Sequence, residues 1–235
     1  MPQELTLKLK EIIQRTYNVK SFRLSLDAPL EFKAGQFMKV ILGEGKEFEH
    51  YLSFSNSPTE KGFIEFTKKI SESAFSKKLC GFQPGDEIKV QAPLGKFTLE
   101  GNESAKIAFL SGGIGITPIR SMVKYAVDKD LGTDMILVYA NRTVRDISFH
   151  QDLEEMQKQY PKFKLAHILC EPAQNFTCSI GLMNAQIVKN EVPDYNERKF
   201  YLCGPPAMVE SMKKMLMEEL QVVKENIITE NFQGY

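Results

Sequence analysis

Residues 107–118 read IAFLSGGIGITP, an apolar run followed by a cluster of glycines and a helix start. This pattern predicts a buried strand that turns sharply into a helix, with Thr117 as the N-cap and Pro118 at the first helical position. Glycines at such a turn let the backbone approach a pyrophosphate, whose charge the free N–H groups and the helix dipole stabilise. A tight turn also needs glycine for its own geometry, so the cluster alone leaves a dinucleotide site and a plain turn both open.

Downstream of this stretch, apolar runs alternate with helical patterns. The apolar runs are Ile107–Leu110, Met135–Tyr139, Phe163–Leu169 and Phe200–Cys203. One helical pattern runs from Thr117 until Gly132 stops it, and a second follows Pro205-Pro206 with methionines that we interpret as core residues. This alternation predicts βαβ units on a parallel sheet.

Upstream of about Gly101 the segments are short, rich in β-forming residues and separated by turn residues. The expected strands are Leu5–Ile13, Ser21–Leu26, Gln36–Leu42, Tyr51–Ser55, Phe63–Ile70 and Glu87–Gln91, with a short helix at Ala74–Leu79. Their alternation is typical of antiparallel strands with one solvent-exposed face, which a small β-barrel would close. The sequence therefore predicts two domains, an antiparallel β-barrel at residues 1–101 and an α/β domain with a parallel sheet at residues 102–235.

Composition excludes several classes of protein. The 235 residues are 43% apolar and 26% charged, as in ordinary globular proteins, and 30 basic residues balance 30 acidic ones. This neutrality argues against the summed positive field of a nucleic-acid or anionic-membrane binder. The N-terminus lacks a basic region followed by an apolar stretch, and no run of about eighteen apolar residues occurs. We therefore expect a cytoplasmic protein without a transmembrane segment.

Cysteines and histidines are few and scattered. They are Cys80, Cys170, Cys178, Cys203, His50, His150 and His167. The cysteine spacings do not match a zinc site or a plant-type iron–sulfur site, and no two histidines are paired at helical spacing. We expect at least three of the cysteines to be buried reduced thiols, and we expect no metal centre, so any redox chemistry would use a bound organic cofactor.

Three motifs resemble signatures of the ferredoxin–NADP reductase superfamily. They are PLGKF at 93–97, GGIGITP at 112–118 and CGPP at 203–206. The segment VYANRT at 138–143, continuing through Asp146-Ile147 to Leu153-Glu154-Glu155, is especially similar to the NADH–cytochrome b5 reductase branch. The resemblance covers nearly the whole chain, and it implies an FAD-binding barrel followed by an NAD(P)-binding α/β domain.

The resemblance implies flavin-binding residues in the barrel. The family's Arg-x-(Tyr/Phe/Leu)-(Ser/Thr) motif is matched by His50-Tyr51-Leu52-Ser53, where Leu52 would pack on the flavin and the Ser53 hydroxyl would hydrogen-bond near N5. His50 replaces the arginine, and an imidazole with a reference pKa of about 6.5 is mostly neutral at pH 7. This departure predicts a weaker grip on the pyrophosphate and leaves both FAD and FMN open, although Lys69 on the adjacent strand could add compensating charge.

A second flavin motif of the family, Gly-x-x-(Ser/Thr), opens a short helix. It is matched by Ser73-Ala74-Phe75-Ser76, with serine in place of glycine. The resemblance implies that Ser76 and the helix-start amides hold the FAD phosphates.

The resemblance also implies a nicotinamide nucleotide site. Its expected residues are Gly112, Gly113, Gly115, Thr117, Pro118, Asn141, Arg142, Cys203, Gly204 and Pro205. Cys203 would lie beside the nicotinamide C4. Arg142 could bind the 2′-phosphate of NADPH, whereas Glu171 would repel it and favour the 2′-hydroxyl of NADH. Both donors stay open, with the cytochrome b5 reductase similarity favouring NADH.

The C-terminal segment resembles the part of the family where an acidic residue and an aromatic residue lie near the flavin. Glu230 would be the acid, and Phe232 or Tyr235 would cover the flavin ring until nicotinamide displaces it. With Ser53, Cys203 and Glu230 as catalytic residues, the implied reaction is hydride transfer from NADH or NADPH to FAD. The electrons would then pass to a separate acceptor, a ferredoxin, a cytochrome or an iron–sulfur protein or subunit.

Three other functions stay open. An NAD(P)H:flavin reductase would hold its flavin loosely, which His50 and Ser73 make plausible. A non-catalytic flavin-bound electron-transfer subunit would depend on a larger complex. A purely structural module would require the glycine turn to be coincidental.

Overall fold

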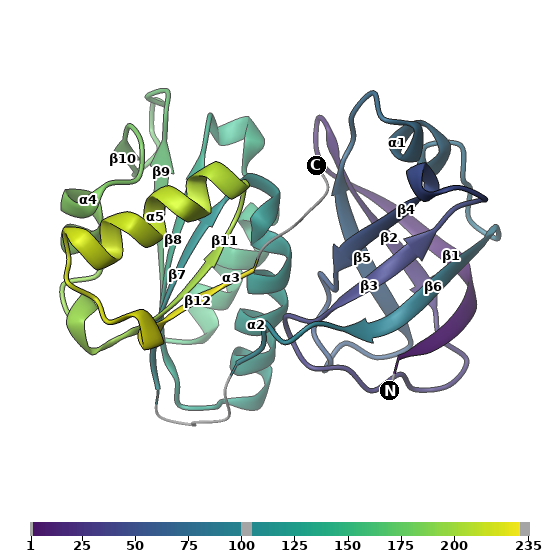
Figure 1. The fold of residues 1–235 in the computed structure, drawn as a ribbon, viewed down its shortest axis with the longest axis horizontal. Helices are drawn as coiled ribbons and strands as arrows, with labels where there is room; N and C mark the ends of the chain where they lie inside the picture. Colours follow the sequence, from purple (N-terminus) through teal and green to yellow (C-terminus); the bar gives the residue numbers. More distant parts are fainter. Residues whose placement is uncertain (1, 100–104, 231–235) are drawn as a thin grey trace.

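The first half of the chain forms an antiparallel barrel, shown on the right of Figure 1. The computed structural model describes residues 2–99 and 105–230. The barrel strands are β1 (Gln3–Thr16), β2 (Val19–Ser25), β3 (Phe37–Ile41), β4 (Glu49–Ser53), β5 (Phe63–Lys69) and β6 (Glu87–Leu94), in the order β4-β3-β6-β1-β2-β5. A bridge from Phe54 to Phe66 and a 2.8 Å hydrogen bond from Ser55 N to Glu65 O join the two ends of this order. The predicted barrel is therefore confirmed.

The barrel core is apolar, and one short helix covers part of it. Phe22, Phe54 and Phe66 are fully buried inside the barrel. Helix α1 spans Ala74–Leu79, the predicted bounds, and contributes Phe75 and Leu79 to the same core. A single turn of 3-10 helix, η1 (Lys46–Phe48), precedes β4.

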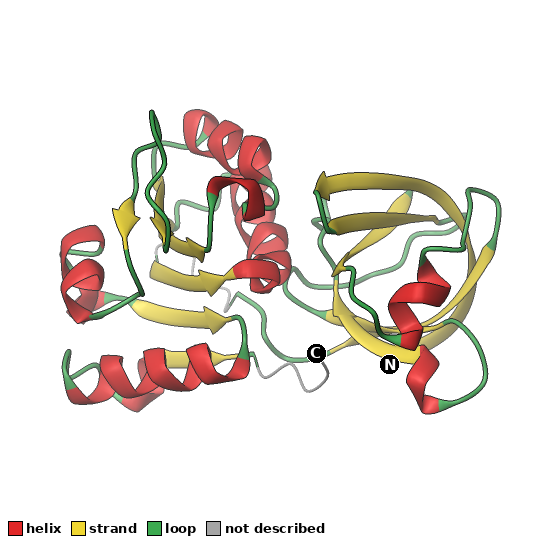
Figure 2. Ribbon diagram, turned by 90° about the horizontal axis from the view of Figure 1, so that it is seen from above, coloured by secondary structure: helices red, strands yellow, loops and turns green. Residues whose placement is uncertain are grey.

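The second half is a parallel sheet with helices on both faces (Figure 2). The strands are β7 (Lys106–Gly112), β8 (Asp134–Asn141), β9 (Phe163–Leu169), β10 (Ser179–Ile180), β11 (Lys199–Cys203) and β12 (Ile227–Thr229), in the order β10-β9-β8-β7-β11-β12. The helices are α2 (Ile116–Lys129), α3 (His150–Gln159), α4 (Ala185–Glu191) and α5 (Pro206–Glu218). Helices α2 and α3 bury their apolar residues against one face of the sheet, and α4 and α5 against the other.

The two ends of α2 differ from the sequence prediction. The N-cap is Gly115, not Thr117, because a 3-10 turn over Gly113–Gly115 leads directly into the helix. Thr117 instead lies in the first turn, where its hydroxyl donates to Ile114 O at 3.2 Å. The helix ends before Gly132, since Asp130 adopts the left-handed conformation with φ 47°. The predicted domain boundary between residues 101 and 102 lies outside the described residues.

The two halves share apolar packing. Ala34 and Phe97, from the barrel half, belong to the same buried cluster as Phe109 and Met122. The ring of Phe97 meets that of Tyr201 edge-on, with 5.5 Å between centroids. The sheet domain is therefore packed directly against the barrel, and α2 lies between them (Figure 1). Within residues 2–99 and 105–230, no helix combines the length and the apolar character needed to cross a membrane.

Candidate functional site

The glycines at the end of β7 lie at the carboxyl edge of the sheet, where Gly112 and Gly115 are buried and Gly113 is half-buried. A Cβ added to Gly112 would lie 2.1 Å from Met208 Cε, and one added to Gly115 would lie 2.4 Å from the carbonyl oxygen of Cys203. Gly113 has φ 53°, and a Cβ there would meet nothing within 4 Å. Two of the glycines thus permit close packing behind the turn, and the third presents its backbone to open space. We call residues 112–116 the glycine turn.

A cavity of about 500 Å³ lies in front of this turn. The sheet domain lines it with Gly112, Gly113, Asn141, Arg142 and Pro205, among others. The barrel lines it with Asn18, Val19 and Lys69. The cavity therefore lies between the domains, at the strand ends where open α/β folds bind their ligands.

Three other predicted nucleotide-site residues, Thr117, Pro118 and Gly204, pack behind the turn, whereas Pro205 lines the cavity. Thr117 and Pro118 are buried in the first turn of α2 and do not line the cavity. A Cβ on Gly204 would lie 2.4 Å from Met208 Cε, so this glycine allows α5 to start close to the glycine turn. Pro205 is the N-cap of α5 and lines the cavity.

Two predicted selectivity residues contact each other at this edge. Arg142 Nε donates to Glu171 Oε1 at 2.9 Å, and the Glu171 N–H donates to the Arg142 carbonyl at 3.1 Å. The two side chains are 79% and 53% exposed, so the pair lies in solvent, where ion pairs are weak. A ligand could therefore displace either partner.

On the barrel, the predicted flavin strand carries a buried polar group without a partner. Ser53 is 4% exposed, and its hydroxyl has no hydrogen-bond partner among the described residues. Leu52 packs against the barrel core, whereas Tyr51 is half exposed and edge-on to the ring of Phe37. Buried hydroxyls are normally hydrogen-bonded, so Ser53 fits a ligand that accepts or donates at this point.

His50 lies in a partly apolar environment. Its ring centroid is 4.3 Å from that of Phe75 on α1. Burial, and then the nearby charge of Lys68, lower the pKa of His50, so the imidazole is neutral at pH 7. The side chains of Lys68 and Lys69 have different environments: Lys68 acts on His50, whereas Lys69 lines the nucleotide cavity. Sequence reasoning named only Lys69, although the alternation of side chains along a strand would have pointed to Lys68.

Ser76 is buried at the start of α1. Its N–H donates to the Ser73 hydroxyl at 3.2 Å, which makes Ser73 the N-cap. The hydroxyls of Ser71, Ser73 and Ser76 also contact one another at 3.1 to 3.2 Å. Serine in place of the family's glycine therefore has a structural role, and phosphate binding by Ser76 stays a prediction.

Cys203 and Glu230 are electrostatic neighbours at the end of β11. Cys203 is the one buried cysteine of the four, so the expectation of at least three buried thiols is wrong. Burial, followed by the charge of Glu230, raises the pKa of the Cys203 thiol well above the usual value. The Glu230 N–H donates to Leu202 O at 3.1 Å. Burial raises the pKa of Glu230 to about 7, and its Oε2 has no hydrogen-bond partner among the described residues. The thiol is thus protonated, while the carboxyl can exchange a proton near neutral pH. Phe232 and Tyr235 lie outside the described residues.

Two family models match the chain. Residues 4–99 match the oxidoreductase FAD-binding domain, and residues 109–214 match the oxidoreductase NAD-binding domain. The first match covers the barrel and the second covers most of the sheet domain, so the cavity lies between an FAD-binding and an NAD-binding domain.

Curated relatives match most of this chain at about 30% identity. The glycine betaine monooxygenase reductase subunit of Chromohalobacter salexigens is 32% identical over 215 residues, which cover 88% of this chain and 58% of that protein. The NADH-cytochrome b5 reductase 1 of Dictyostelium discoideum is 31% identical over 240 residues, which cover 97% of this chain and 82% of the relative. The chain thus spans less than two thirds of the first relative and most of the second.

Solved structures share the fold. A cytochrome P450 reductase from Amycolatopsis superposes with a TM-score of 0.86 at 22% identity, over 99% of this chain and 71% of that one. The cytochrome b5 reductase domain of Ulva prolifera nitrate reductase gives 0.85 at 23% identity, over 97% of both chains.

Proposed function

The chain belongs to the ferredoxin reductase-like oxidoreductases, which include the NADH–cytochrome b5 reductases, and we propose its reaction on that basis. Like them, it pairs an FAD-binding domain with an NAD-binding domain. It transfers a hydride from NAD(P)H to FAD and passes the electrons to a separate acceptor protein. The observation that carries the proposal is the glycine turn, whose Gly113 backbone faces a cavity shared by both domains.

The residues present fit both cofactors. The backbone of Gly113, which faces open space, and the dipole of α2, which starts at the glycine turn, suit a pyrophosphate. The unpartnered hydroxyl of Ser53 fits the flavin, with His50, Ser76 and Lys68 towards its phosphates. We assign NAD(P) to the cavity and FAD to the barrel on these grounds.

FAD, when bound, supplies the exchange between two-electron and one-electron transfer. The chain supplies the rest. Ser53 offers a hydrogen bond from a buried hydroxyl. Cys203, protonated and fully buried, excludes water without adding charge, and Glu230 holds or releases a proton at its carboxyl near pH 7. We propose these three as the catalytic residues.

We propose NADH as the preferred donor. A 2′-phosphate at the ends of β8 and β9 would compete with Glu171 for Arg142 and would be repelled by that carboxylate. A 2′-hydroxyl could instead donate to Glu171.

The acceptor is a ferredoxin, a cytochrome or an iron–sulfur protein or subunit. Support comes from the names of the relatives, a monooxygenase reductase subunit and a cytochrome b5 reductase. We place the protein in the cytoplasm because its four cysteines are free thiols, which a reducing compartment preserves.

The test is the anaerobic visible spectrum of the purified protein before and after addition of NADH or, separately, NADPH. We expect a bound-flavin spectrum that NADH bleaches faster than NADPH. A colourless protein that stays inert with added FAD would contradict the proposal. A colourless protein that turns over added flavin would support the flavin reductase instead, and a yellow one inert with every artificial acceptor would support the non-catalytic subunit.

A further inference from the structure

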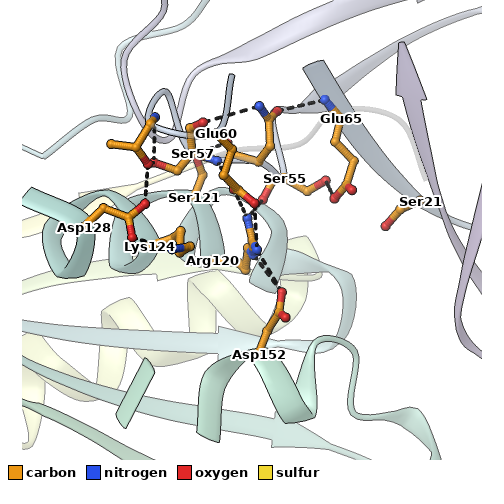
Figure 3. Close-up of polar contacts among 12 residues, drawn as sticks. Ser21, Ser55, Ser57, Glu60, Glu65, Arg120, Ser121, Lys124, Asp128 and Asp152 are labelled. Carbon is orange, nitrogen blue, oxygen red and sulfur yellow. Dashed lines mark hydrogen bonds and ion pairs between the residues drawn. The ribbon is translucent and has the colours of Figure 1, made fainter. Parts of the chain in front are cut away.

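Arg120 is a buried arginine that joins the two domains (Figure 3). It lies in α2, and its side chain is 6% exposed. Its Nη1 donates to the carbonyl of Ser55 at 3.1 Å and forms an ion pair with Glu60. Its Nε and Nη2 donate to Asp152 Oδ2 on α3, at 3.1 and 2.9 Å. One guanidinium thus contacts both the barrel half and the sheet half.

The contacts of Arg120 lie close in the chain to both proposed cofactor sites. Arg120 is in the helix that begins at the glycine turn. The flavin strand β4 ends at Ser53. Ser55 lies two residues further along the chain, and Glu60 follows in the same segment. Arg120 therefore connects the helix of the proposed nucleotide site to the segment that continues the proposed flavin strand.

Other bonds hold residues 55–60, here called the 55–60 segment, from both sides. On the α2 side, the Ser121 hydroxyl donates to Asn56 O at 2.7 Å, and the Thr59 hydroxyl bonds to Asp128. On the barrel side, Asn56 Oδ1 accepts from the Glu65 N–H at 2.8 Å. The segment is thereby fixed to both domains.

Holding the two domains together does not by itself require a buried charge at this position. The apolar contacts of Ala34 and Phe97 already join the domains, and a buried ion pair often stabilises no more than apolar side chains of the same volume. The guanidinium adds directional hydrogen bonding, because its planar set of N–H groups bonds several acceptors in a fixed geometry. The pKa of Arg120 stays raised, because the attraction of Glu60 and Asp152 outweighs its burial, so the side chain is always charged.

We propose that Arg120 is a positioning residue that sets the register between the glycine turn and the Ser53 strand. Nicotinamide and flavin, held by different domains, then meet at a reactive separation. Hydride transfer is sensitive to such registration, because a misplacement of about 1 Å can cost about a hundredfold in rate. This inference rests on the proposed function.

The test compares Arg120→Lys with Arg198→Lys in the FAD-loaded protein. Arg198 is a matched control, because its side chain is 4% exposed and paired with Asp134 and Asp194. It also donates to Ile107 O, at the amino edge of the sheet and away from the glycine turn. Lysine keeps the charge at either site but cannot reproduce the planar set of N–H groups.

We expect Arg120→Lys to slow anaerobic flavin reduction at saturating NADH by about 10- to 100-fold. The NADH concentration that half-saturates the reduction should stay within about threefold of the wild-type value, since the lost geometry affects the reaction more than binding. Arg198→Lys should reduce its flavin at the wild-type rate. Ser121→Ala, a smaller change, should slow reduction in the same direction but by less.

A second readout does not depend on activity. In the protein without cofactors, hydrogen–deuterium exchange of the 55–60 segment should be faster in Arg120→Lys than in wild type, and unchanged in Arg198→Lys. Wild-type reduction rates in folded Arg120→Lys and Ser121→Ala would overturn the inference, and so would equal losses in the Arg120 and Arg198 variants. If wild-type protein is not reduced at all, the proposed function fails, while exchange still decides whether Arg120 holds the segment.

Discussion

Arg142 and Glu171 form an ion pair, with 2.9 Å between Nε and Oε1, that links the end of β8 to the residues after β9. The sequence assigns these two residues opposite preferences, Arg142 for a 2′-phosphate and Glu171 for a 2′-hydroxyl. In the folded chain, the Arg142 guanidinium that would bind the 2′-phosphate of NADPH is already paired with the Glu171 carboxylate that would repel it.

Glu171→Gln should therefore increase the use of NADPH. We expect kcat/KM for NADPH to rise about 10-fold relative to NADH, the size of one charge-assisted hydrogen bond reduced by solvent. Steady-state kinetics with both donors measure this ratio. Glu218→Gln, which removes an exposed carboxylate paired with Lys214 on α5, is the control and should leave the ratio unchanged. An unchanged ratio in Glu171→Gln would show that selectivity lies elsewhere.

Gly113→Ala and Gly115→Ala should have different effects. At Gly115 the new methyl group would lie 2.4 Å from the Cys203 carbonyl oxygen, so we expect a loss of about 1 to 3 kcal/mol in the free energy of unfolding. At Gly113 the space is open, and the left-handed φ should cost only about 1 kcal/mol. In Gly113→Ala, however, the new methyl group would face the open space beside the cavity, so KM for the nicotinamide nucleotide should rise. Equal melting temperatures for the two variants would contradict this assignment.

The neighbouring lysines of β5 should separate the two cofactors. Lys68→Met should weaken FAD retention, because it removes the positive charge next to the neutral His50. Lys69→Met should leave FAD retention intact and raise KM for NADH, because Lys69 lines the nucleotide cavity. Flavin fluorescence released on dilution and steady-state kinetics test the two effects, with each variant the control for the other. Identical behaviour of both variants would be inconsistent with the different environments of these side chains.

Glu230 should make stability and activity depend on pH near neutrality. Its pKa is raised from 4.5 to about 7 by burial, so the folded state binds its proton more tightly than the unfolded state. The stability contributed by neutral Glu230 is fully present below about pH 4.5 and is lost as pH rises towards 7. Glu230→Gln should remove this fall between pH 5 and 8, seen as a smaller decrease in melting temperature. The flavin reduction rate of this variant should also lose its pH dependence near 7, and a retained dependence would assign it to another group.

His167 should have the opposite dependence. Burial, followed by the charge of His150, lowers the pKa of His167 to about 4 from 6.5. The unfolded state therefore takes up a proton first, and stability is lost as pH falls from about 6.5 to 4. His167→Gln should reduce this acid sensitivity in thermal unfolding, while exposed Lys164→Gln on the same strand should not. Equal acid sensitivity in the His167 variant and wild type would contradict the lowered pKa.

Local patterns allowed the fold to be predicted from the sequence. Alternating and continuous apolar runs predicted the barrel strands and the parallel strands, because burial on one face or two is visible in neighbouring residues. The bounds of α1 and the glycine turn were predicted for the same local reason. Thr117 was wrongly predicted as the N-cap, because a 3-10 turn starting at Gly113 extends helical structure two residues towards the glycines, and glycine leaves no sequence signal of that choice.

The sequence by itself determined that a glycine turn, a flavin-type strand and a C-terminal acid are present, since each is a short motif. Only the tertiary structure decided which of them meet. The pairing of β2 with β5 places Asn18 beside Lys69, and domain packing brings both to the nucleotide cavity. Domain packing also places Arg120 against Ser55, 65 residues earlier in the chain. Such contacts depend on long-range strand pairing and on the register of two domains, which no local pattern encodes.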